Sequence, residues 1–310
     1  MSNILIIEHG SLGDLIQANG AIKDIKNFYK NRKVFLLTAQ PYAIFMSECP
    51  YIDGVIIDKR LPRWNIFYLN NLKKILAKYN FTKVYDLQNS SRSKFYKRFI
   101  IKNVEWSSSE TSLEQGQKKR DFDKEPVLDR MEIQLKKSGV ETQFIKNVDL
   151  SWALKDISRL TRQYANGEYI LIFPFCSKKH LNKKWPYFKE LISNLKTSYK
   201  NKYPVLIAPG PNEISEANEL NAKVVLSNNE PIDIKTLISL INNSKFVISN
   251  DTGPAHIASH LDKKGLVLFG SHTTARKVNI ENFNFKALTV KNLKDLSVKT
   301  VLDEIKTKLN

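Results

Sequence analysis

The chain has 310 residues and a mass of 35.7 kDa, which suits two domains of about 150 residues better than one. Hydrophobic residues make up 42% and aromatic residues 10% of the chain, which excludes general disorder. No apolar run reaches the roughly 18 residues that a membrane span needs, and the first residues lack the features of a signal peptide. Two cysteines, Cys49 and Cys176, exclude a disulfide framework and a four-thiolate zinc site. We therefore expect a cytoplasmic protein.

The net charge is the unusual bulk property, because 49 basic and 31 acidic residues give +18. Such an excess predicts an anionic partner, whether nucleic acid, a phosphorylated substrate or acidic lipid headgroups. Between residues 59 and 102, 12 basic residues accompany a single acid, Asp86, so this window alone carries +11. A lysine-rich solvated surface is the alternative explanation of the window.

In the first half of the chain, short runs rich in Ile, Val and Leu predict strands, and longer runs with apolar residues three and four apart predict helices. The expected strands are Asn3–Ile7, Lys33–Leu37, Gly54–Ile57 and Lys83–Tyr85, and the expected helices are Asp14–Tyr29, Pro41–Glu48 and Asn65–Tyr79. This alternation is typical of a parallel sheet with helices on both faces. The polar stretch from Trp106 to Glu125 interrupts the alternation and is predicted to be a long mobile loop.

The alternation resumes at Glu168 and continues towards the end of the chain. The expected strands are Tyr169–Phe173, Val205–Ala208, Lys223–Val225, Phe246–Ser249 and Leu266–Phe269, and the expected helices are Pro186–Tyr199, Glu213–Leu220, Ile234–Asn243 and Pro254–Leu261. An amphipathic final helix, Leu293–Leu309, is expected to pack on one of the two domains. The pattern predicts an α/β protein with two Rossmann-like domains, residues 1–160 and 161–310, whose parallel sheets face each other across a ligand cleft.

The turn after the first expected strand, from Glu8 to Asp14, contains two glycines three residues apart. Such glycines permit a tight turn and a close approach of a ligand to the backbone, although the dinucleotide fingerprint is absent. Asp14 stands where the next helix begins, a position at which the helix dipole alone favours an acid. The same dipole favours the ionised carboxylate that a general base requires, so Asp14 is also a candidate base.

A buried strand, a turn and a helix follow one another from Phe246 to His256. The turn Asp251-Thr252-Gly253 leads into a helix with proline near its start, where free N–H groups can bind a diphosphate. His256 can hydrogen-bond a phosphate or a ribose hydroxyl, and packing against the sheet is the alternative. The spacing of His256 and His260 admits a zinc site, but the acid that such a motif carries between its histidines is missing. No metal is expected.

Polar residues also follow other expected strands. In the second domain, Lys183 can reach a phosphate while Trp185 anchors the turn. In the first domain, the run from Asp86 to Arg92 could hold an acceptor, with Arg92 on its anionic group. A helix N-cap at Ser90 or Ser91 is the simpler interpretation of that run.

At these residues the chain resembles glycosyltransferase family 9, the bacterial heptosyltransferases of lipopolysaccharide core assembly. The matching segments appear in the family's order and span about residues 3 to 270. They are Ser11-Leu12-Gly13-Asp14, Asp86-Leu87-Gln88, Lys183-Lys184-Trp185-Pro186, Pro209-Gly210-Pro211-Asn212-Glu213, Ser249-Asn250-Asp251-Thr252-Gly253-Pro254-Ala255-His256 and Phe269-Gly270-Ser271.

The resemblance implies a two-domain GT-B fold, a nucleotide-sugar donor held by the second domain, and inversion at the anomeric carbon without a metal or other cofactor. It implies that Asp14 takes the proton of the acceptor hydroxyl and that Lys183 pairs with the donor phosphates. Other donor contacts are implied for Glu213, on the ribose, and for Asp251, Thr252, Gly253 and His256, on the diphosphate and sugar. Acceptor contacts are expected from Gly13, Gln88, Arg92, Arg60 and Arg63.

The chain departs from the family's pattern at two places. The family usually has a basic residue six positions before the aspartate, where this chain has Glu8. After Phe269-Gly270 the family commonly continues with Pro-Thr, whereas this chain has Ser271 and His272. Both departures bear on the identity of the sugar and acceptor more than on the type of reaction.

We therefore expect an inverting glycosyltransferase that moves a heptose from ADP-heptose to a lipopolysaccharide core acceptor. The basic window would face the phosphorylated acceptor or the anionic inner leaflet, with the enzyme in the cytoplasm or peripheral at the inner membrane. One alternative is a transferase that uses another nucleotide sugar for a surface glycan. Another is a basic nucleic-acid-binding protein, but stacking aromatics and recognition motifs are missing and no nucleic-acid partner is expected. An inactive family member that serves as a scaffold is the third.

Overall fold

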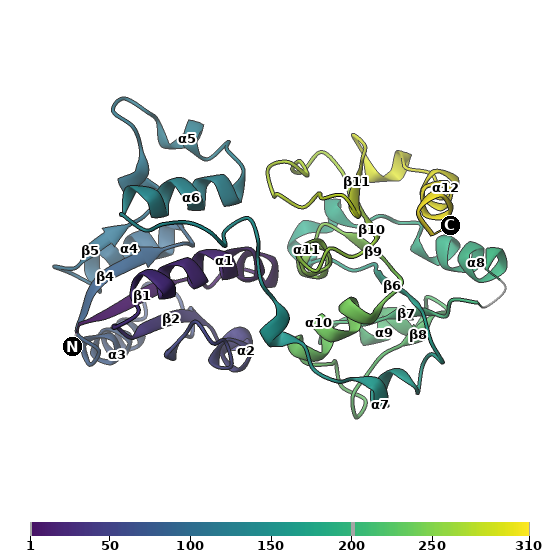
Figure 1. The fold of residues 1–310 in the computed structure, drawn as a ribbon, viewed down its shortest axis with the longest axis horizontal. Helices are drawn as coiled ribbons and strands as arrows, with labels where there is room; N and C mark the ends of the chain where they lie inside the picture. Colours follow the sequence, from purple (N-terminus) through teal and green to yellow (C-terminus); the bar gives the residue numbers. More distant parts are fainter. Residues whose placement is uncertain (1, 200–201, 310) are drawn as a thin grey trace. The chain divides into compact units, whose positions relative to one another are not determined.

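The computed structural model describes residues 2–199 and 202–309. The chain divides into two compact units, Met1–Trp152 and Ala153–Asn310, and the division lies ahead of the boundary expected at residue 160. Each unit is built on a parallel sheet with helices packed on it (Figure 1), so the α/β class expected from the sequence is confirmed. Within the described ranges, no helix has both the length and the apolar character needed to cross a bilayer.

The sheet of the first unit has five parallel strands in the order β3-β2-β1-β4-β5. The strands are β1 Asn3–Ile7, β2 Val34–Ala39, β3 Gly54–Asp58, β4 Phe81–Asp86 and β5 Glu105–Ser107. The helices are α1 Leu12–Phe28, α2 Ala43–Ser47, α3 Ile66–Ala77, α4 Ser91–Phe99, α5 Lys119–Phe122 and α6 Val127–Lys137, with 3-10 turns at Gln40–Tyr42 and Glu110–Ser112. The strand order reverses between β1 and β4, and ligands of such sheets bind at the carboxyl ends of the strands at this switch point.

Both faces of the first sheet are covered by helices. Right-handed crossovers place α1 and α2 on one face and α3 and α4 on the other, because the chain winds in opposite directions before and after β3. On the second face, Leu5 and Ile7 of β1 pack with Leu72 of α3 and Tyr96 of α4. Gly20 of α1 lies so close to the backbone of residue 144 that a Cβ would collide with its carbonyl oxygen. The result is a rigid platform from which the loops after β1 and β4 project.

The stretch from Trp106 to Glu125 is folded, so the prediction of a mobile loop was wrong. Trp106 lies in β5 and is buried, and the side chain of Phe122 in α5 is buried as well. Between them, the Thr111 hydroxyl accepts the Ser108 N–H at 2.8 Å and donates to the Ser108 carbonyl oxygen at 2.9 Å. Polar side chains that bond their own backbone stabilise a segment without producing any apolar periodicity. The sequence pattern therefore gave no sign of this order.

The sheet of the second unit has six parallel strands in the order β11-β10-β9-β6-β7-β8, with its switch point between β9 and β6. The strands are β6 Ile170–Phe173, β7 Val205–Ile207, β8 Lys223–Val224, β9 Phe246–Asn250, β10 Gly265–Phe269 and β11 Phe285–Thr289. The helices are α7 Ser158–Thr161, α8 Phe188–Ser198, α9 Ile214–Asn218, α10 Ile234–Asn243, α11 Gly253–His260 and α12 Val298–Leu309, with 3-10 turns at Lys178–Lys183 and Leu293–Asp295. A further 3-10 turn, Ser151–Ala153, spans the division between the units.

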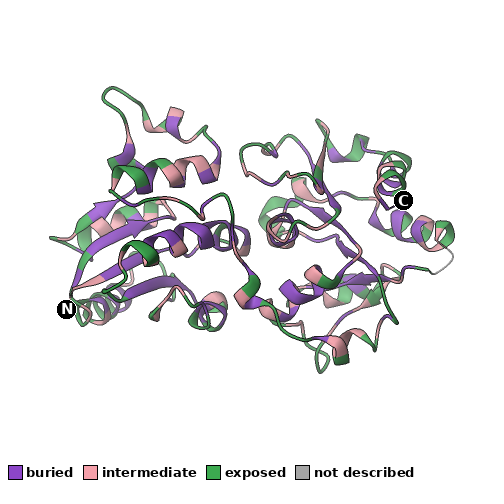
Figure 2. Cartoon of the chain, in the orientation of Figure 1, coloured by how far each residue is buried: buried purple, intermediate pink, exposed green. Residues whose placement is uncertain are grey.

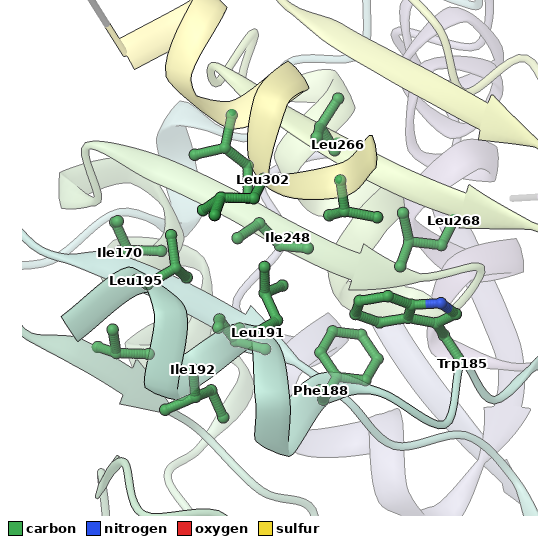
Figure 3. Packing of buried hydrophobic residues seen from close by; sticks show 14 of the residues in the cluster. Ile170, Trp185, Phe188, Leu191, Ile192, Leu195, Ile248, Leu266, Leu268 and Leu302 are labelled. Atoms are coloured by element: carbon green, nitrogen blue, oxygen red, sulfur yellow. The ribbon is translucent and has the colours of Figure 1, made fainter. Parts of the chain in front are cut away.

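One face of the second sheet forms a large apolar core with α8 and α12 (Figure 3). Ile248 and Leu268 of the sheet pack with Leu191 of α8 and Leu302 of α12 in this cluster. The final helix therefore packs on its own unit, which settles the choice that its amphipathic pattern left open. The helix α11 lies next to α10 and contacts β9, and it begins at Gly253, after Asp251 and Thr252 at the carboxyl end of that strand. The core thus holds the loop that contains Asp251 against a fixed sheet edge.

Candidate active site

The turn after β1 holds the Asp14 carboxylate in a defined orientation. Ser11 is the N-cap of α1, and its hydroxyl accepts the Asp14 N–H at 3.4 Å. In return, Oδ2 of Asp14 accepts the Ser11 N–H at 2.7 Å and the Ser11 hydroxyl at 2.8 Å. A Cβ on Gly10 would lie 2.5 Å from that oxygen, so the arrangement requires glycine there. Asp14 therefore has the helix-start role expected for an acid, while its side chain stays exposed to solvent.

A pocket of about 100 Å³ opens beside this turn, at the switch point of the first sheet. Glu8 and Asp14 line it from the loop after β1, and Gln88 lines it from the loop after β4. The Gln88 side-chain oxygen accepts the His9 N–H at 3.1 Å and so joins the two loops. The remaining lining residues are Leu87, Asn89, Phe122, Val127, Arg130 and Met131. The pocket therefore combines a carboxyl pair with amide donors and one arginine.

Glu8, which lines this pocket, is buried and stands at the position where the family usually has a basic residue. Burial, together with the nearby charge of Asp14, raises the pKa of Glu8 to about 8. The Gly10 N–H, which donates to Oε1 of Glu8 at 2.9 Å, offsets only part of this shift. At neutral pH Glu8 is therefore mainly the uncharged acid, which can donate as well as accept a hydrogen bond.

The three arginines expected to bind an acceptor lie together after β3 and β4, but outside the set of residues that line the pocket. The Arg60 guanidinium donates to the His9 carbonyl oxygen at 2.8 Å, and Arg92 donates to the Leu61 carbonyl oxygen at 2.9 Å. Arg63 donates to the Ser91 carbonyl oxygen at 3.2 Å. Each guanidinium has five N–H groups, so these bonds leave donors for an anion.

A buried carboxylate, Asp58, organises the loops that carry these arginines. The Tyr96 hydroxyl donates to Asp58 at 2.7 Å, the Arg60 N–H donates to it at 2.7 Å, and the Tyr68 hydroxyl bonds to it as well. The expected acceptor residue Gly13 is buried in the first turn of α1, so its acceptor contact stays a prediction. The helix N-cap predicted at Ser90 or Ser91 is confirmed, since Ser90 caps α4.

In the second unit, Asp251 follows β9 and is the centre of a buried ionic cluster. Lys183 Nζ lies 2.6 Å from one of its carboxylate oxygens, and His272 Nε2 lies 3.0 Å from the same oxygen. His256 Nε2 lies 3.8 Å from the other oxygen. Burial alone would raise the pKa of Asp251, but the hydrogen bond with His272 and the charge of Lys183 lower it to about 2. Asp251 is thus an ionised acceptor held by three basic side chains.

Trp185 fixes the loop that carries Lys183, as the sequence predicted. Its side chain is fully buried, with its ring edge against Phe188 in the core (Figure 3), and its indole N–H donates to the Leu296 carbonyl oxygen at 2.9 Å. Its backbone N–H donates to the side chain of Asn250 at 3.1 Å, and Asn250 also donates to the Pro174 carbonyl oxygen at 2.8 Å. The loops after β6 and β9 are therefore joined at the switch point of the second sheet.

The start of α11 and the residue Glu213 are the remaining candidate contacts of the nucleotide-sugar donor. Thr252 is the N-cap of α11 and makes no side-chain hydrogen bond to the helix start. Pro254 has no N–H, and the Ala255 N–H donates to the Thr252 carbonyl oxygen at 3.0 Å, so the N–H groups that can meet an anion here are those of Thr252 and Gly253. Glu213 follows β7, the strand beside β6, and accepts the Gly210 N–H at 2.7 Å. Burial raises the pKa of Glu213, and that hydrogen bond acts in the opposite direction.

Several residues of these sites had no role predicted from the sequence. His272 was noted only as a departure from the family pattern, although it lies against Asp251 with its ring stacked on Phe269. Arg130 of α6 was not singled out, because it belongs to no motif, and Asn89 was considered only as one member of the polar run from Asp86 to Arg92. In the part of the chain that the structure describes, no group of three or more His, Cys, Asp or Glu side chains has the arrangement of a metal site.

Comparison with known proteins gives consistent matches. The sequence profile of glycosyltransferase family 9 (heptosyltransferase) matches residues 69–301. Lipopolysaccharide heptosyltransferase 1 of Campylobacter coli is 24% identical over 324 residues, which cover 94% of this chain and 92% of that protein. The solved structure of E. coli heptosyltransferase WaaC with ADP-2-deoxy-2-fluoro heptose has a TM-score of 0.73 and 19% identity, covering 98% of this chain and 99% of its own. A family 9 glycosyl transferase from Veillonella parvula has a TM-score of 0.75 and 15% identity, covering 99% and 97%.

The two parallel-sheet units and these likenesses define a glycosyltransferase with the GT-B fold. The family profile extends over most of the chain and includes both units. The chain belongs to glycosyltransferase family 9, the heptosyltransferases. The family and the enzyme class that the motifs suggested are therefore confirmed.

Proposed function

We propose that this enzyme transfers a heptose from ADP-heptose to a lipopolysaccharide core acceptor, with inversion at the anomeric carbon and without a metal. The named ligand of WaaC and the named role of the Campylobacter protein support the donor and the acceptor, respectively. A nucleotide sugar is a cytoplasmic metabolite, so we propose that the reaction takes place on the cytoplasmic side of the inner membrane. The observation that carries the proposal is the Lys183–Asp251 pair at the switch point of the second sheet, directly before α11.

The donor contacts follow from the charges around that pair. Departure of the nucleoside diphosphate develops negative charge, which Lys183 and the N–H groups at the start of α11 can stabilise without a cation. Thr252 and Gly253 border this helix start and would approach the phosphates. An ionised Asp251 repels phosphate, so we assign it to a sugar hydroxyl, with His256 beside it. Glu213 would accept hydrogen bonds from the ribose hydroxyls.

Asp14 is our candidate for the base that removes the proton from the attacking acceptor hydroxyl. One of its oxygens is held by Ser11, and the side chain lines a pocket in which an acceptor hydroxyl can bind. A base in a fixed orientation accelerates proton transfer by about 10² to 10⁴. Gln88 lines the same pocket, and Arg60, Arg63 and Arg92 would bind anionic groups of the acceptor beyond it.

The alternative donor is another nucleotide sugar, and a specific feature favours keeping it. The pocket is lined by the uncharged Glu8 instead of the family's usual basic residue, and His272 replaces the usual threonine near the donor turn. Both changes alter the hydrogen-bonding groups that a sugar or acceptor would meet. The choice of sugar is therefore the part of the proposal that most needs a direct assay.

A thermal-shift panel of nucleotide sugars tests the donor, because a ligand that binds only the native state raises the melting temperature. We expect ADP-heptose to give the largest shift, with or without a chelator. Transfer that stops on chelation would contradict the metal-independent mechanism, and a larger shift with another nucleotide sugar would favour the alternative. Product analysis by NMR would show the anomeric configuration.

Lys183→Ala and Lys184→Ala form a matched pair for the donor site. Lys183 contacts buried Asp251, whereas Lys184 pairs with the exposed Glu216. Loss of a charge-assisted contact to a phosphate should raise the donor KM of Lys183→Ala by about 10- to 100-fold. Lys184→Ala should stay close to the parent enzyme. An unchanged KM for Lys183→Ala would rule out its role in donor binding.

A further inference from the structure

Large apolar side chains are exposed together where α3 begins. Trp64 is 80%, Ile66 67% and Phe67 91% exposed. These residues are held in place, because Asn65 caps α3 by accepting the Tyr68 N–H at 2.9 Å. Scattered exposed apolar residues are common, but three within four positions form a patch of the kind that marks an interaction site.

Lysines continue this patch along the solvent-facing side of α3, which is coloured as exposed in Figure 2. On a helix, residues 7 and 11 positions apart lie on one face, so Lys74 and Lys78 follow Phe67. Lys73 follows Ile66 in the same way. We call these six residues, Trp64, Ile66, Phe67, Lys73, Lys74 and Lys78, the α3 surface.

The charge of the α3 surface is not neutralised by neighbouring acids. The one acid between residues 59 and 102 is Asp86, which is buried at the end of β4. In the described part of the chain, the salt bridges of this window use Lys83 and Lys94, which pair with Glu105 and Glu110. The lysines of α3 take part in neither of them. The surface therefore combines an apolar tip with a cationic field.

We propose that the α3 surface binds an anionic lipid bilayer, with Trp64, Ile66 and Phe67 inserted at the headgroup boundary and the three lysines against the headgroups. Tryptophan and phenylalanine favour the membrane interface, and lysines on the polar side of an interfacial helix bind acidic lipids. A second copy of the chain fits less well, because a symmetric contact would bring two cationic surfaces together. Nucleic acid explains the lysines but not the aliphatic Ile66.

The inference adds a partner to the proposed function and does not depend on the identity of the donor. An enzyme that acts on an amphiphilic acceptor gains from a position at the bilayer, because the acceptor then reaches it by lateral diffusion. None of the six residues belongs to the candidate donor or acceptor contacts. Transfer to a water-soluble acceptor analogue should therefore stay unchanged when the α3 surface is altered, which separates this proposal from the proposed function.

Vesicle co-sedimentation of the full chain tests the proposal. The probes are vesicles of phosphatidylcholine alone and of phosphatidylcholine mixed with phosphatidylglycerol. We expect strong binding to the mixed vesicles and weak binding to the neutral ones. Added salt should weaken binding, since each lysine near an anionic surface contributes about a fivefold factor that ions screen. Equal binding to both kinds of vesicle, or none to either, would overturn the proposal.

Two double variants with matched controls locate the binding. Trp64→Ser with Phe67→Ser, and Lys73→Glu with Lys74→Glu, should each weaken binding to the mixed vesicles by about tenfold or more. Ile44→Ser, at a residue 77% exposed on α2, and Lys291→Glu with Lys294→Glu, at exposed sites of the second unit, should leave it unchanged.

Two further results would overturn the proposal. One is equal binding by the α3 variants and their controls. The other is a dimer, seen by sedimentation without lipid, that the α3 variants convert to monomer while their vesicle binding is unaffected. The α3 surface would then bind a second copy of the chain and not a bilayer.

Discussion

Replacing Glu8 by glutamine should stabilise the protein at neutral pH. Glu8 is 2% exposed, and its pKa of about 8 compares with 4.5 for an unperturbed side chain. At pH 7 the unfolded chain carries the ionised group, whereas the folded chain keeps the proton. The cost is about 1.4 kcal/mol per pH unit over the 2.5 units between pH 4.5 and 7, or about 3 kcal/mol. Glutamine has the shape of the uncharged acid and can accept the Gly10 N–H, so it avoids this cost.

The pH dependence distinguishes this explanation from a simple packing effect. Below pH 4.5 the carboxyl is neutral in both states, so Glu8→Gln and the parent should be equally stable. Between pH 4.5 and 8 the folded state binds the extra proton, so the parent loses stability as pH rises and the advantage of the variant grows. Above pH 8 the difference should level off.

Urea unfolding followed by tryptophan fluorescence at a series of pH values measures the difference between the two proteins. Glu141→Gln, at an exposed position of the same unit, is the matched control and should show no pH-dependent gain. A Glu8→Gln protein that is less stable than its parent at pH 7, or whose difference does not change with pH, would refute the reasoning.

Two other variants probe the site loops. Gly10→Ala places a Cβ 2.5 Å from the Asp14 carboxylate and should push this carboxylate out of the cap of α1. The free energy of unfolding in urea should fall by about 1 kcal/mol, and kcat should fall clearly. An unfolding free energy and a kcat equal to those of the parent would show that the turn tolerates a side chain. His272→Ala removes the hydrogen bond to Asp251, so the pKa of Asp251 should rise from about 2 towards 3.8. The stability that this carboxylate contributes above pH 3.8 should then be smaller, so acid unfolding should begin at a higher pH, and donor binding measured by calorimetry should weaken several-fold. An unchanged acid transition would remove His272 from the cluster.

Strong apolar periodicity made most of the fold predictable. The strand Asn3–Ile7 and the helix Ile234–Asn243 were predicted with their observed bounds. The strand is an apolar run, whereas the helix has apolar residues three and four positions apart. The edge strand β11 was missed, since Phe285–Thr289 is only partly buried and its apolar residues are interrupted by Lys286. Edge strands face solvent on one side and carry a weaker pattern.

The candidate site was predictable where a motif places one residue beside a strand end. Asp14, Lys183 and Asp251 were selected in this way, and Lys183 and Asp251 are in contact. Arg130 reaches its pocket from α6, far along the chain, and no local pattern reports such a contact. The raised pKa of Glu8 likewise arises from burial by the whole unit and could not be read from neighbouring residues.

The proposed function rests on the claim that Asp14 removes the proton from the acceptor hydroxyl during transfer. The most direct test is Asp14→Asn, which can keep the hydrogen bonds of the helix cap but cannot take a proton. Under saturating donor, its single-turnover transfer rate should fall by about 10² to 10⁴, while the donor Kd from calorimetry stays near that of the parent. Transfer at the parent rate would contradict the claim.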